Sequence, residues 1–222
     1  MSNNLIWDEI YSSGSIQRYP WDIVVSFVFR NAPRNVMRNQ INILELGFGT
    51  APNLWFASRE GFSVSGVESS HNAVKLAKKR FLDESLEGDL RLGDFTDLPF
   101  DDNTFDLAID RCSLVCVDVK KQKLAINEVN RVLKKGGRFL HNSYPDCHPS
   151  ANTGDVSDGG LVENIKGGTL VGAGSLCFSS LEDINEKFAQ NWNVISKQRK
   201  VISDLTNPLL NHSEWIILAE KI

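Results

Sequence analysis

The fold of this chain is decided by the sequence INILELGFGTAPN, which occupies residues 41–53. A short apolar run rich in β-branched residues carries an acidic residue, Glu45, near its end and leads into a loop with two glycines. Gly47 and Gly49 lack a Cβ, so the backbone can turn sharply and approach a ligand closely. An apolar helical pattern then starts at residues 54–57. A strand, a tight glycine turn and a helix N-terminus in this order indicate a nucleotide-type binding site.

The composition is that of an ordinary globular protein. The chain has 222 residues, of which 41% are hydrophobic and 23% are charged, and this predicts one domain with a sizeable core. A net charge of -4 gives no general electrostatic reason to bind nucleic acid or an anionic membrane. No apolar run approaches the roughly 20 residues of a membrane span, and a secretory signal is not recognisable. We therefore expect a cytoplasmic protein with no nucleic-acid or membrane partner.

The four cysteines are too few and too scattered for a disulfide framework in a chain of this length. Cys112 and Cys116, together with Cys147 and His148, are an alternative set of metal ligands. Because the sequence contains no CxxC pair, we expect buried free thiols and no metal site.

Strand and helix patterns alternate after residue 41, which predicts a mostly parallel sheet with helices on both faces. The last two expected strands, 192–201 and 214–220, follow each other without a helix, so one antiparallel strand is expected near the edge. The predicted fold is an α/β, Rossmann-like three-layer sandwich with a mostly parallel seven-stranded sheet and one antiparallel strand. The helix expected at 121–135 should be ended by the Gly136-Gly137 pair.

Three acidic residues fall at expected strand ends, where open α/β sheets bind ligands. Glu68 ends the second strand, 21 positions after Gly47, which suits a carboxylate that accepts both hydroxyls of a ribose. Asp94 can accept from an adenine amino group, and Asp110 ends the fourth strand in the same crevice. The alternative is that each is an ordinary helix cap or loop carboxylate.

The glycine motif does not match that of a typical dinucleotide-binding or triphosphate-binding site. The G-x-G-x-x-G fingerprint has Pro52 in place of its third glycine, and the Gly-Lys-Ser/Thr of a P-loop is absent. Glu45 next to the turn would repel a pyrophosphate, whereas it suits a cationic ligand such as an amino group or a sulfonium.

The segment ELGFGTA at 45–51 resembles the E/D-x-G-x-G-x-G motif of class I S-adenosylmethionine-dependent methyltransferases, with Ala51 for the last glycine. GDF at 93–95 is similar to the adenine-contacting segment of that family. LPFDDNTFD at 98–106 and LKKGG at 133–137 are similar to stretches of its small-molecule branch. The resemblance implies S-adenosyl-L-methionine as the cofactor and S-adenosyl-L-homocysteine as the product.

The aromatic-rich N-terminus has two interpretations, a helix packed through bulky aromatics or a lid beside the glycine loop. WDEIY at 7–11, with Gly14 and Pro20-Trp21, resembles a segment of thiopurine-like methyltransferases that folds over the cofactor, which favours the lid. Arg18 could then pair with the cofactor carboxylate. The cofactor contacts implied by the family are Trp7, Tyr11, Arg18, Tyr19, Glu45, Gly47, Gly49, Ala51, Asn53, Glu68, Ser69, Asp94, Phe95 and Asp110.

We expect a single methyltransferase domain over residues 1–222, in four segments. These are an N-terminal helical lid at 1–38, a cofactor-binding core at 41–142, an insertion at 143–178 that covers the acceptor, and a terminal helix with a strand pair at 179–222. The insertion is rich in Gly, Asn, Asp and Pro, and long loops of this kind are usually functional or mobile.

Methyl transfer is an in-line displacement, for which the enzyme aligns the reactants, and an oxygen nucleophile also needs a base. The candidates that follow the fourth and fifth strands are Asp110, Arg111, His141, Tyr144 and His148, and His141, Asp110 and Tyr144 are the expected catalytic residues. A lone histidine is more often structural, so His141 has both interpretations.

The expected reaction is methylation of an O or N atom of a small-molecule acceptor by a monomer or homodimer. Similar sequences in bacterial surface-polysaccharide pathways favour a sugar or an amino- or phospho-alcohol. Two alternatives are a catalytically inactive methyltransferase-like binding module and an NAD-type oxidoreductase. The second is opposed by Pro52 and by the lack of a Tyr-x-x-x-Lys pair.

Overall fold

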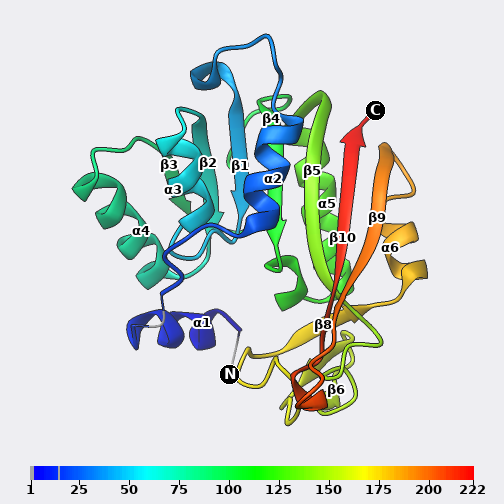
Figure 1. The fold of residues 1–222 in the computed structure, drawn as a ribbon. Coiled ribbons are helices and arrows are strands. Elements are labelled where there is room, and N and C mark those ends of the chain that lie inside the picture. Colours follow the sequence, from blue (N-terminus) through cyan, green and yellow to red (C-terminus); the bar gives the residue numbers. More distant parts are fainter. Residues whose placement is uncertain (1–2, 15) are drawn as a thin grey trace.

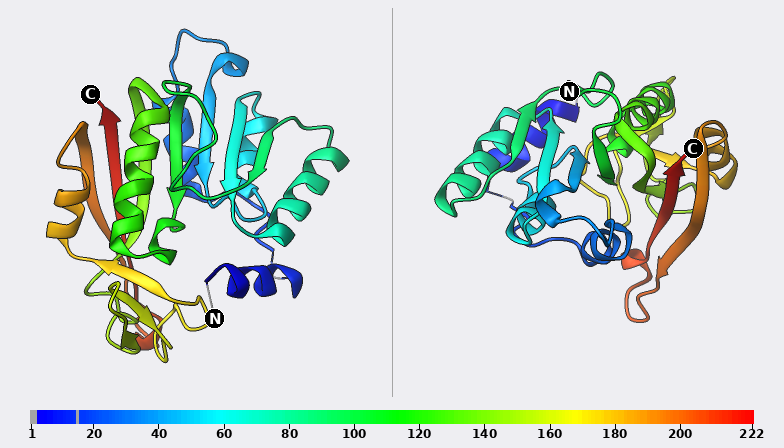
Figure 2. Two further views of the ribbon diagram at one scale, coloured as in Figure 1. Left: turned by 180° about the vertical axis from the view of Figure 1, so that it is seen from behind. Right: turned by 90° about the horizontal axis from the view of Figure 1, so that it is seen from above.

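The computed structural model describes residues 3–14 and 16–222, so the expectations for Met1, Ser2 and Ser15 in the lid lie outside the described residues. A twisted central sheet is covered by helices on both faces (Figures 1 and 2). The helices are α1 (Asn3–Ser12), α2 (Asp22–Asn31), α3 (Pro52–Arg59), α4 (His71–Asp83), α5 (Val119–Val132) and α6 (Leu181–Lys187). No helix in these ranges combines the length and apolar character that crossing a membrane requires.

The main sheet has the predicted topology. Its parallel strands, in the order β3-β2-β1-β4-β5, are β1 (Asn42–Leu46), β2 (Ser63–Glu68), β3 (Asp89–Leu92), β4 (Phe105–Arg111) and β5 (Leu133–Pro145). β10 (His212–Lys221) runs antiparallel to β5 on one side and to β9 (Trp192–Ile202) on the other. These seven strands have the expected mostly parallel arrangement with β10 antiparallel, but in the described residues three further strands bring the sheet to ten and add two antiparallel pairings.

The insertion at 143–178 is more structured than the sequence predicted. β8 (Leu176–Ser179) pairs in parallel with the end of β5, at Tyr144 and Pro145. β7 (Leu161–Glu163) runs antiparallel to β8, and β6 (Asp155–Val156) runs antiparallel to β7. These short strands extend the sheet at the end where the parallel strands finish, on the other side of that end from α1 (Figure 1).

Each face of the sheet has its own apolar core. On one face, α2, α3 and α4 pack through Phe27, Leu54 and Phe81 against strand residues such as Ile43. On the other face, α5 and α6 pack against neighbouring positions of the same strands. Alternate side chains of a strand point to opposite faces, so a buried parallel strand such as β1 is apolar at nearly every position.

Local sequence signals fix several element ends. The Ser70 hydroxyl accepts a hydrogen bond from the Ala73 N–H and caps α4, and Ser180 and Asp183 form a reciprocal capping box on α6. The predicted cap of α5 by Gly136-Gly137 is wrong. The helix ends at Val132 because Leu133 adopts an extended conformation and begins β5, and Gly136 serves a turn within that strand.

Candidate active site

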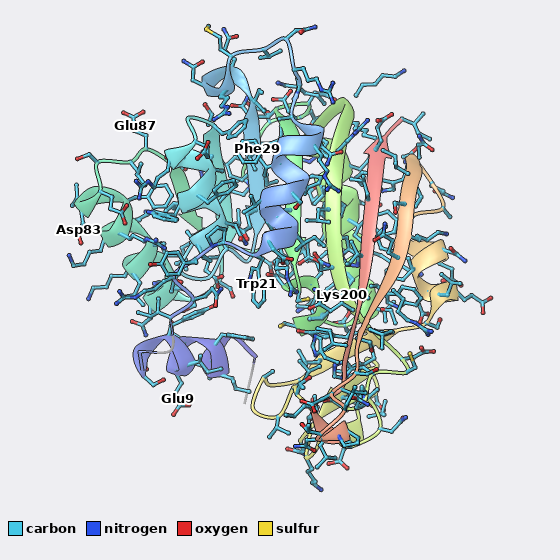
Figure 3. All side chains as sticks on the ribbon, in the orientation of Figure 1. Glu9, Trp21, Phe29, Asp83, Glu87 and Lys200 are labelled. Carbon is cyan, nitrogen blue, oxygen red and sulfur yellow. The ribbon has the colours of Figure 1, made fainter. Side chains whose placement is uncertain are left out.

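A cavity of about 790 Å³ opens at the carboxyl ends of the parallel strands. Gly47, Glu68, Asp94 and Arg111, which end or follow β1 to β4, contribute to its wall. Trp21 and Lys200, which are labelled in Figure 3, line it as well. The volume is in the range of small-molecule sites, and the position is the one at which open α/β sheets bind ligands.

The glycine turn approaches its neighbours so closely that side chains would not fit. Gly47 and Gly49 have φ values of +60° and +54°, and a Cβ on either would lie 2.5 Å from a neighbouring side-chain atom, of Ser113 or of Tyr11. Ala51, in place of the third glycine of the motif, also has a positive φ of 56°. It is fully buried as the N-cap of α3 and does not contribute to the cavity wall, so its small side chain is accommodated there.

Glu68 holds the glycine turn in place. Its Oε2 accepts from the Gly49 N–H at 2.8 Å, and its Oε1 accepts from the Ser70 N–H at 2.8 Å. Burial raises the pKa of this carboxyl, although these backbone donors oppose the rise. Ser69, Asp94 and Phe95, which the resemblance implies as cofactor contacts, also line the cavity.

Glu45 is a buried acid, and one of its carboxyl oxygens accepts no hydrogen bond among the described residues. Its Oε1 accepts a hydrogen bond from Asn53 at 2.6 Å, while its Oε2 is buried and has no partner among the described residues. Burial raises the pKa of Glu45 to about 8. Both residues line the cavity, so a ligand cation at the glycine turn would supply the missing partner and favour the ionised acid. These residues therefore fit a sulfonium- and ammonium-bearing cofactor.

The N-terminal segment lies over this part of the cavity. Asp8 joins α1 to the start of α4, because its Oδ1 accepts from the Ser70 hydroxyl at 2.5 Å and from the Asn72 N–H at 2.9 Å. Trp7 and Tyr11 of the same helix line the cavity.

Two expected contacts of this segment lie elsewhere. Arg18 is not on the cavity wall, and its carbonyl accepts from Arg80. Tyr19 is 70% exposed and packs edge-on against Trp55. Gln17 and Trp21 line the cavity instead, although the sequence had not marked either as a contact.

Asp110 and His141 form a pair inside the protein. Both side chains are 0% exposed, Asp110 Oδ2 lies 2.7 Å from His141 Nδ1, and neither residue lines the cavity. Asp110 Oδ1 accepts from the backbone N–H groups of Ser113 and Leu114. The His141 ring packs against Phe139 and Phe188, on the face covered by α6. The pair therefore fixes the loop after β4, and this placement argues against direct contact with a substrate.

A second polar group occupies the wall away from the glycine turn. Arg111 pairs with Glu214 at 2.7 Å, and their side chains are 10% and 8% exposed. The Arg111 guanidinium also lies over the Trp21 ring, 4.2 Å from its centroid. Tyr144, His212 and Lys200 line the same region. Among the candidates from the sequence, Tyr144 and Arg111 are on the wall, while Lys200, His212 and Glu214 were not predicted.

The four cysteines are free thiols, but the expectation that they are buried holds fully only for Cys177. Cys112 and Cys116 are partly buried, and Cys147 is exposed. Burial raises the pKa of Cys112 and of Cys116 to about 12, so these thiols stay protonated near neutral pH. In the described ranges, no group of three or more His, Cys, Asp or Glu side chains is placed to hold a metal ion.

The fold and the position of the cavity are similar to those of class I S-adenosylmethionine-dependent methyltransferases. Residues 43–137 match the family model described as a methyltransferase domain, which confirms the resemblance of the cofactor-binding segment.

Individual methyltransferases are similar to this chain in sequence or in fold. The chain is similar to a ubiquinone/menaquinone biosynthesis C-methyltransferase of Desulfotalea psychrophila, with 38% identity over 101 residues, 46% of this chain and 39% of the relative. It thus spans well under half of the length of the curated relatives it matches. The fold is similar to a Methanosarcina mazei S-adenosylmethionine-dependent methyltransferase, with a TM-score of 0.71 at 17% identity over 92% of this chain and 99% of that one. It is also similar to a Haemonchus contortus phosphoethanolamine N-methyltransferase solved with S-adenosylhomocysteine, with a TM-score of 0.66 at 17% identity over 99% and 57% of the two chains.

Proposed function

We propose that the protein transfers a methyl group from S-adenosylmethionine to an oxygen or nitrogen atom of a small-molecule acceptor. The observation that carries this proposal is the unpartnered, buried Oε2 of Glu45 beside the Gly47 turn. A buried carboxyl oxygen without a donor is costly, and a cationic ligand removes that cost. Glu68, at the end of the neighbouring strand, stands where a ribose would follow.

The cofactor would be held by residues of several elements. Glu45 and Asn53 face its amino-acid and sulfonium part, Glu68 and Ser69 face the ribose, and Asp94 and Phe95 face the adenine. The two glycines allow close approach of the backbone, while Trp7 and Tyr11 of α1 cover the site. When bound, S-adenosylmethionine supplies an electrophilic methyl group. The chain itself aligns the acceptor and excludes water.

For the acceptor we propose a sugar or an amino- or phospho-alcohol, as in bacterial surface-polysaccharide synthesis, modified in the cytoplasm by a monomer or homodimer. The support is chemical, because the wall beyond the glycine turn carries Arg111, Lys200 and Glu214, charges of both signs that suit a polar molecule. One relative is named a C-methyltransferase, so carbon is the competing acceptor atom.

Two alternative functions differ from methyl transfer in what the site would bind or catalyse. An inactive binding module would keep the Glu45 and Glu68 site and lack transfer. An NAD-type oxidoreductase would bind a pyrophosphate at the glycine turn, where Pro52 replaces the third glycine of the dinucleotide fingerprint.

Calorimetry with S-adenosylmethionine, S-adenosylhomocysteine and NAD tests the three functions. We expect both sulfur ligands to bind and NAD not to bind. If neither sulfur ligand binds, the proposal is wrong. Binding followed by no transfer of labelled methyl to any acceptor pool would favour the inactive module.

A further inference from the structure

We infer that Glu214 receives the proton-bearing group of the acceptor, so that the site selects alcohols, phenols or amines that lose a proton on methylation. This inference rests on the proposed function and names the group that would recognise its acceptor. Glu214 is the third residue of the antiparallel strand β10, lines the cavity and is buried. It lies on the wall beyond β4 and β5, away from the glycine turn that suits the cofactor.

One oxygen of the Glu214 carboxyl group already forms hydrogen bonds within the protein. Glu214 Oε1 accepts from Arg111 at 2.7 Å and lies 3.3 Å from Nε2 of His212. Among the described residues no hydrogen bond reaches Oε2. A carboxylate has lone pairs on both oxygens, so Oε2 can accept from a ligand in the cavity.

The histidines near Glu214 have a defined direction of hydrogen bonding. The Ser150 N–H donates to Nδ1 of His148 at 3.0 Å, so the proton of the neutral His148 ring is on Nε2. Burial, together with the nearby His212, lowers the pKa of His148 to about 4, which keeps this ring neutral. His148 Nε2 therefore donates to Nδ1 of His212 at 3.1 Å, a nitrogen that also lies 2.7 Å from the Thr169 hydroxyl. The proton of His212 is then on Nε2, which points at Glu214.

This arrangement makes His212 a donor to Glu214, not a base for the acceptor. Burial alone would raise the pKa of Glu214, but the bond from His212 and the charge of Arg111 together hold it below its usual value. Tyr144 of β5, Lys200 opposite Glu214 on β9, and Cys112, whose pKa the charge of Glu214 helps to raise, are further titratable groups on this wall. Glu214 is thus ionised and oriented before an acceptor arrives.

Methyl transfer to the acceptor needs no reactant beyond the acceptor, S-adenosylmethionine and Glu214. The lone pair of the acceptor oxygen or nitrogen forms the new bond to the methyl carbon. The carbon–sulfur bond breaks with its electron pair on sulfur, which becomes the neutral thioether of S-adenosylhomocysteine. The acceptor proton passes to Oε2 of Glu214. His212 and Arg111 are positioning residues, because they act through Glu214.

Labelled S-adenosylmethionine and two acceptor pools test the inference. One pool holds ethanolamine, phosphoethanolamine, glucose, galactose, phenol and catechol, which lose a proton when methylated on O or N. The other holds trimethylamine and dimethyl sulfide, which do not. We expect product from the first pool only. Product from the second pool, or methyl on carbon, overturns the inference and leaves methyl transfer intact. No product from either pool, with cofactor bound, contradicts the proposed function as well.

The role of Glu214 is then tested by substitution, with the acceptor identified in the first experiment. In Glu214→Gln the amide oxygen still accepts from Arg111, but the NH2 group faces the acceptor and cannot accept. We expect kcat/KM to fall about 100-fold or more. Calorimetry should show unchanged S-adenosylhomocysteine affinity and at least about tenfold weaker acceptor binding to that complex. Glu220→Gln, on the same strand and paired with Arg138 away from the cavity, is the matched control. Wild-type kcat/KM in Glu214→Gln overturns the inference.

The positioning role of His212 is tested by the pH profile of kcat/KM. His212→Gln keeps an N–H near the place of Nε2 and should retain most activity. His212→Leu removes the donor, so the acid limb of the pH profile of kcat/KM should move to higher pH as the pKa of Glu214 rises. Identical pH profiles for the two variants contradict the role of His212. Thermal unfolding of each variant separates these effects from a loss of folding.

Discussion

Glu68 Oε2 accepts a hydrogen bond from the Gly49 N–H at 2.8 Å, so the acid that ends β2 is tied directly to the turn that follows β1. The parallel pairing of β1 with β2 brings the two strand ends together. One carboxyl group thus both supports the glycine turn and faces the cavity.

Removing this carboxyl group should weaken cofactor binding. For Glu68→Ala we expect the affinity for S-adenosylhomocysteine to fall about 10- to 100-fold, the scale of one or two charge-assisted hydrogen bonds. Calorimetry gives the affinity, and Glu60→Ala, an exposed acid paired with Arg38, is the control. Unchanged affinity in Glu68→Ala would remove the ribose assignment.

Cofactor affinity should depend on pH through Glu45. The pKa of this acid is about 8 in the protein without ligand, so it is mostly protonated at pH 6.5. A bound sulfonium favours the ionised form, and binding below pH 8 therefore releases a proton. We expect affinity for S-adenosylmethionine to rise from pH 6.5 to 8 and then level off. The same titration on Glu45→Gln should be flat, and an equal slope in both proteins would contradict this linkage.

The attachment of α1 to α4 should control how well the site is covered. Asp8→Ala removes the acceptor for Ser70 and Asn72, so α1 should exchange its amide hydrogens faster and S-adenosylhomocysteine affinity should fall about tenfold. Glu9→Ala, at the next and exposed position, should behave like wild type. Equal exchange rates in the two variants would contradict the role of Asp8.

The glycine turn offers a test of steric fit. Gly49→Ala combines backbone strain with a Cβ 2.5 Å from the Tyr11 hydroxyl, whereas Gly136→Ala at φ +77° has strain alone and nothing within 4 Å. Strain of this kind costs about 1–2 kcal/mol, so Gly136→Ala should lower the unfolding free energy by that amount. Gly49→Ala should lower it further and also weaken S-adenosylhomocysteine binding. Adding Tyr11→Phe should recover part of the loss, and no recovery would indicate that the contact is not limiting.

Replacing His141 decides between its two interpretations. His141→Leu leaves Asp110 without one of its buried partners, so we expect a loss of roughly 1–3 kcal/mol in unfolding free energy with nearly unchanged cofactor affinity. Denaturant unfolding and calorimetry measure the two quantities, and His71→Leu at an exposed position is the control. A large loss of kcat with wild-type stability would restore the catalytic interpretation.

The positions proposed to hold the cofactor could be found in the sequence because the patterns that mark them are local. Gly47, Gly49 and Glu68 follow strands whose apolar runs are plain in the sequence, and parallel pairing brings such strand ends to one edge. The topology followed from the alternation of strands and helices for the same reason.

The acceptor half was not predictable from local pattern. Arg111 and Glu214 are 103 positions apart, and only the placement of β10 beside β5 brings them together. His141 shows the same limit at a finer scale, since a strand turns its side chains alternately to opposite faces. A sequence position at a strand end does not tell which face its side chain joins, and His141 joins the face of Phe139.

Because β10 runs antiparallel to β5, its first residues lie at the end of the sheet where the parallel strands finish, and Glu214 meets Arg111 there. The family match ends at residue 137, before Tyr144, His148, Lys200, His212 and Glu214. Under the proposed function, substitutions at these five positions would change which acceptor fits and leave the proposed donor contacts of Glu45 and Glu68 in place.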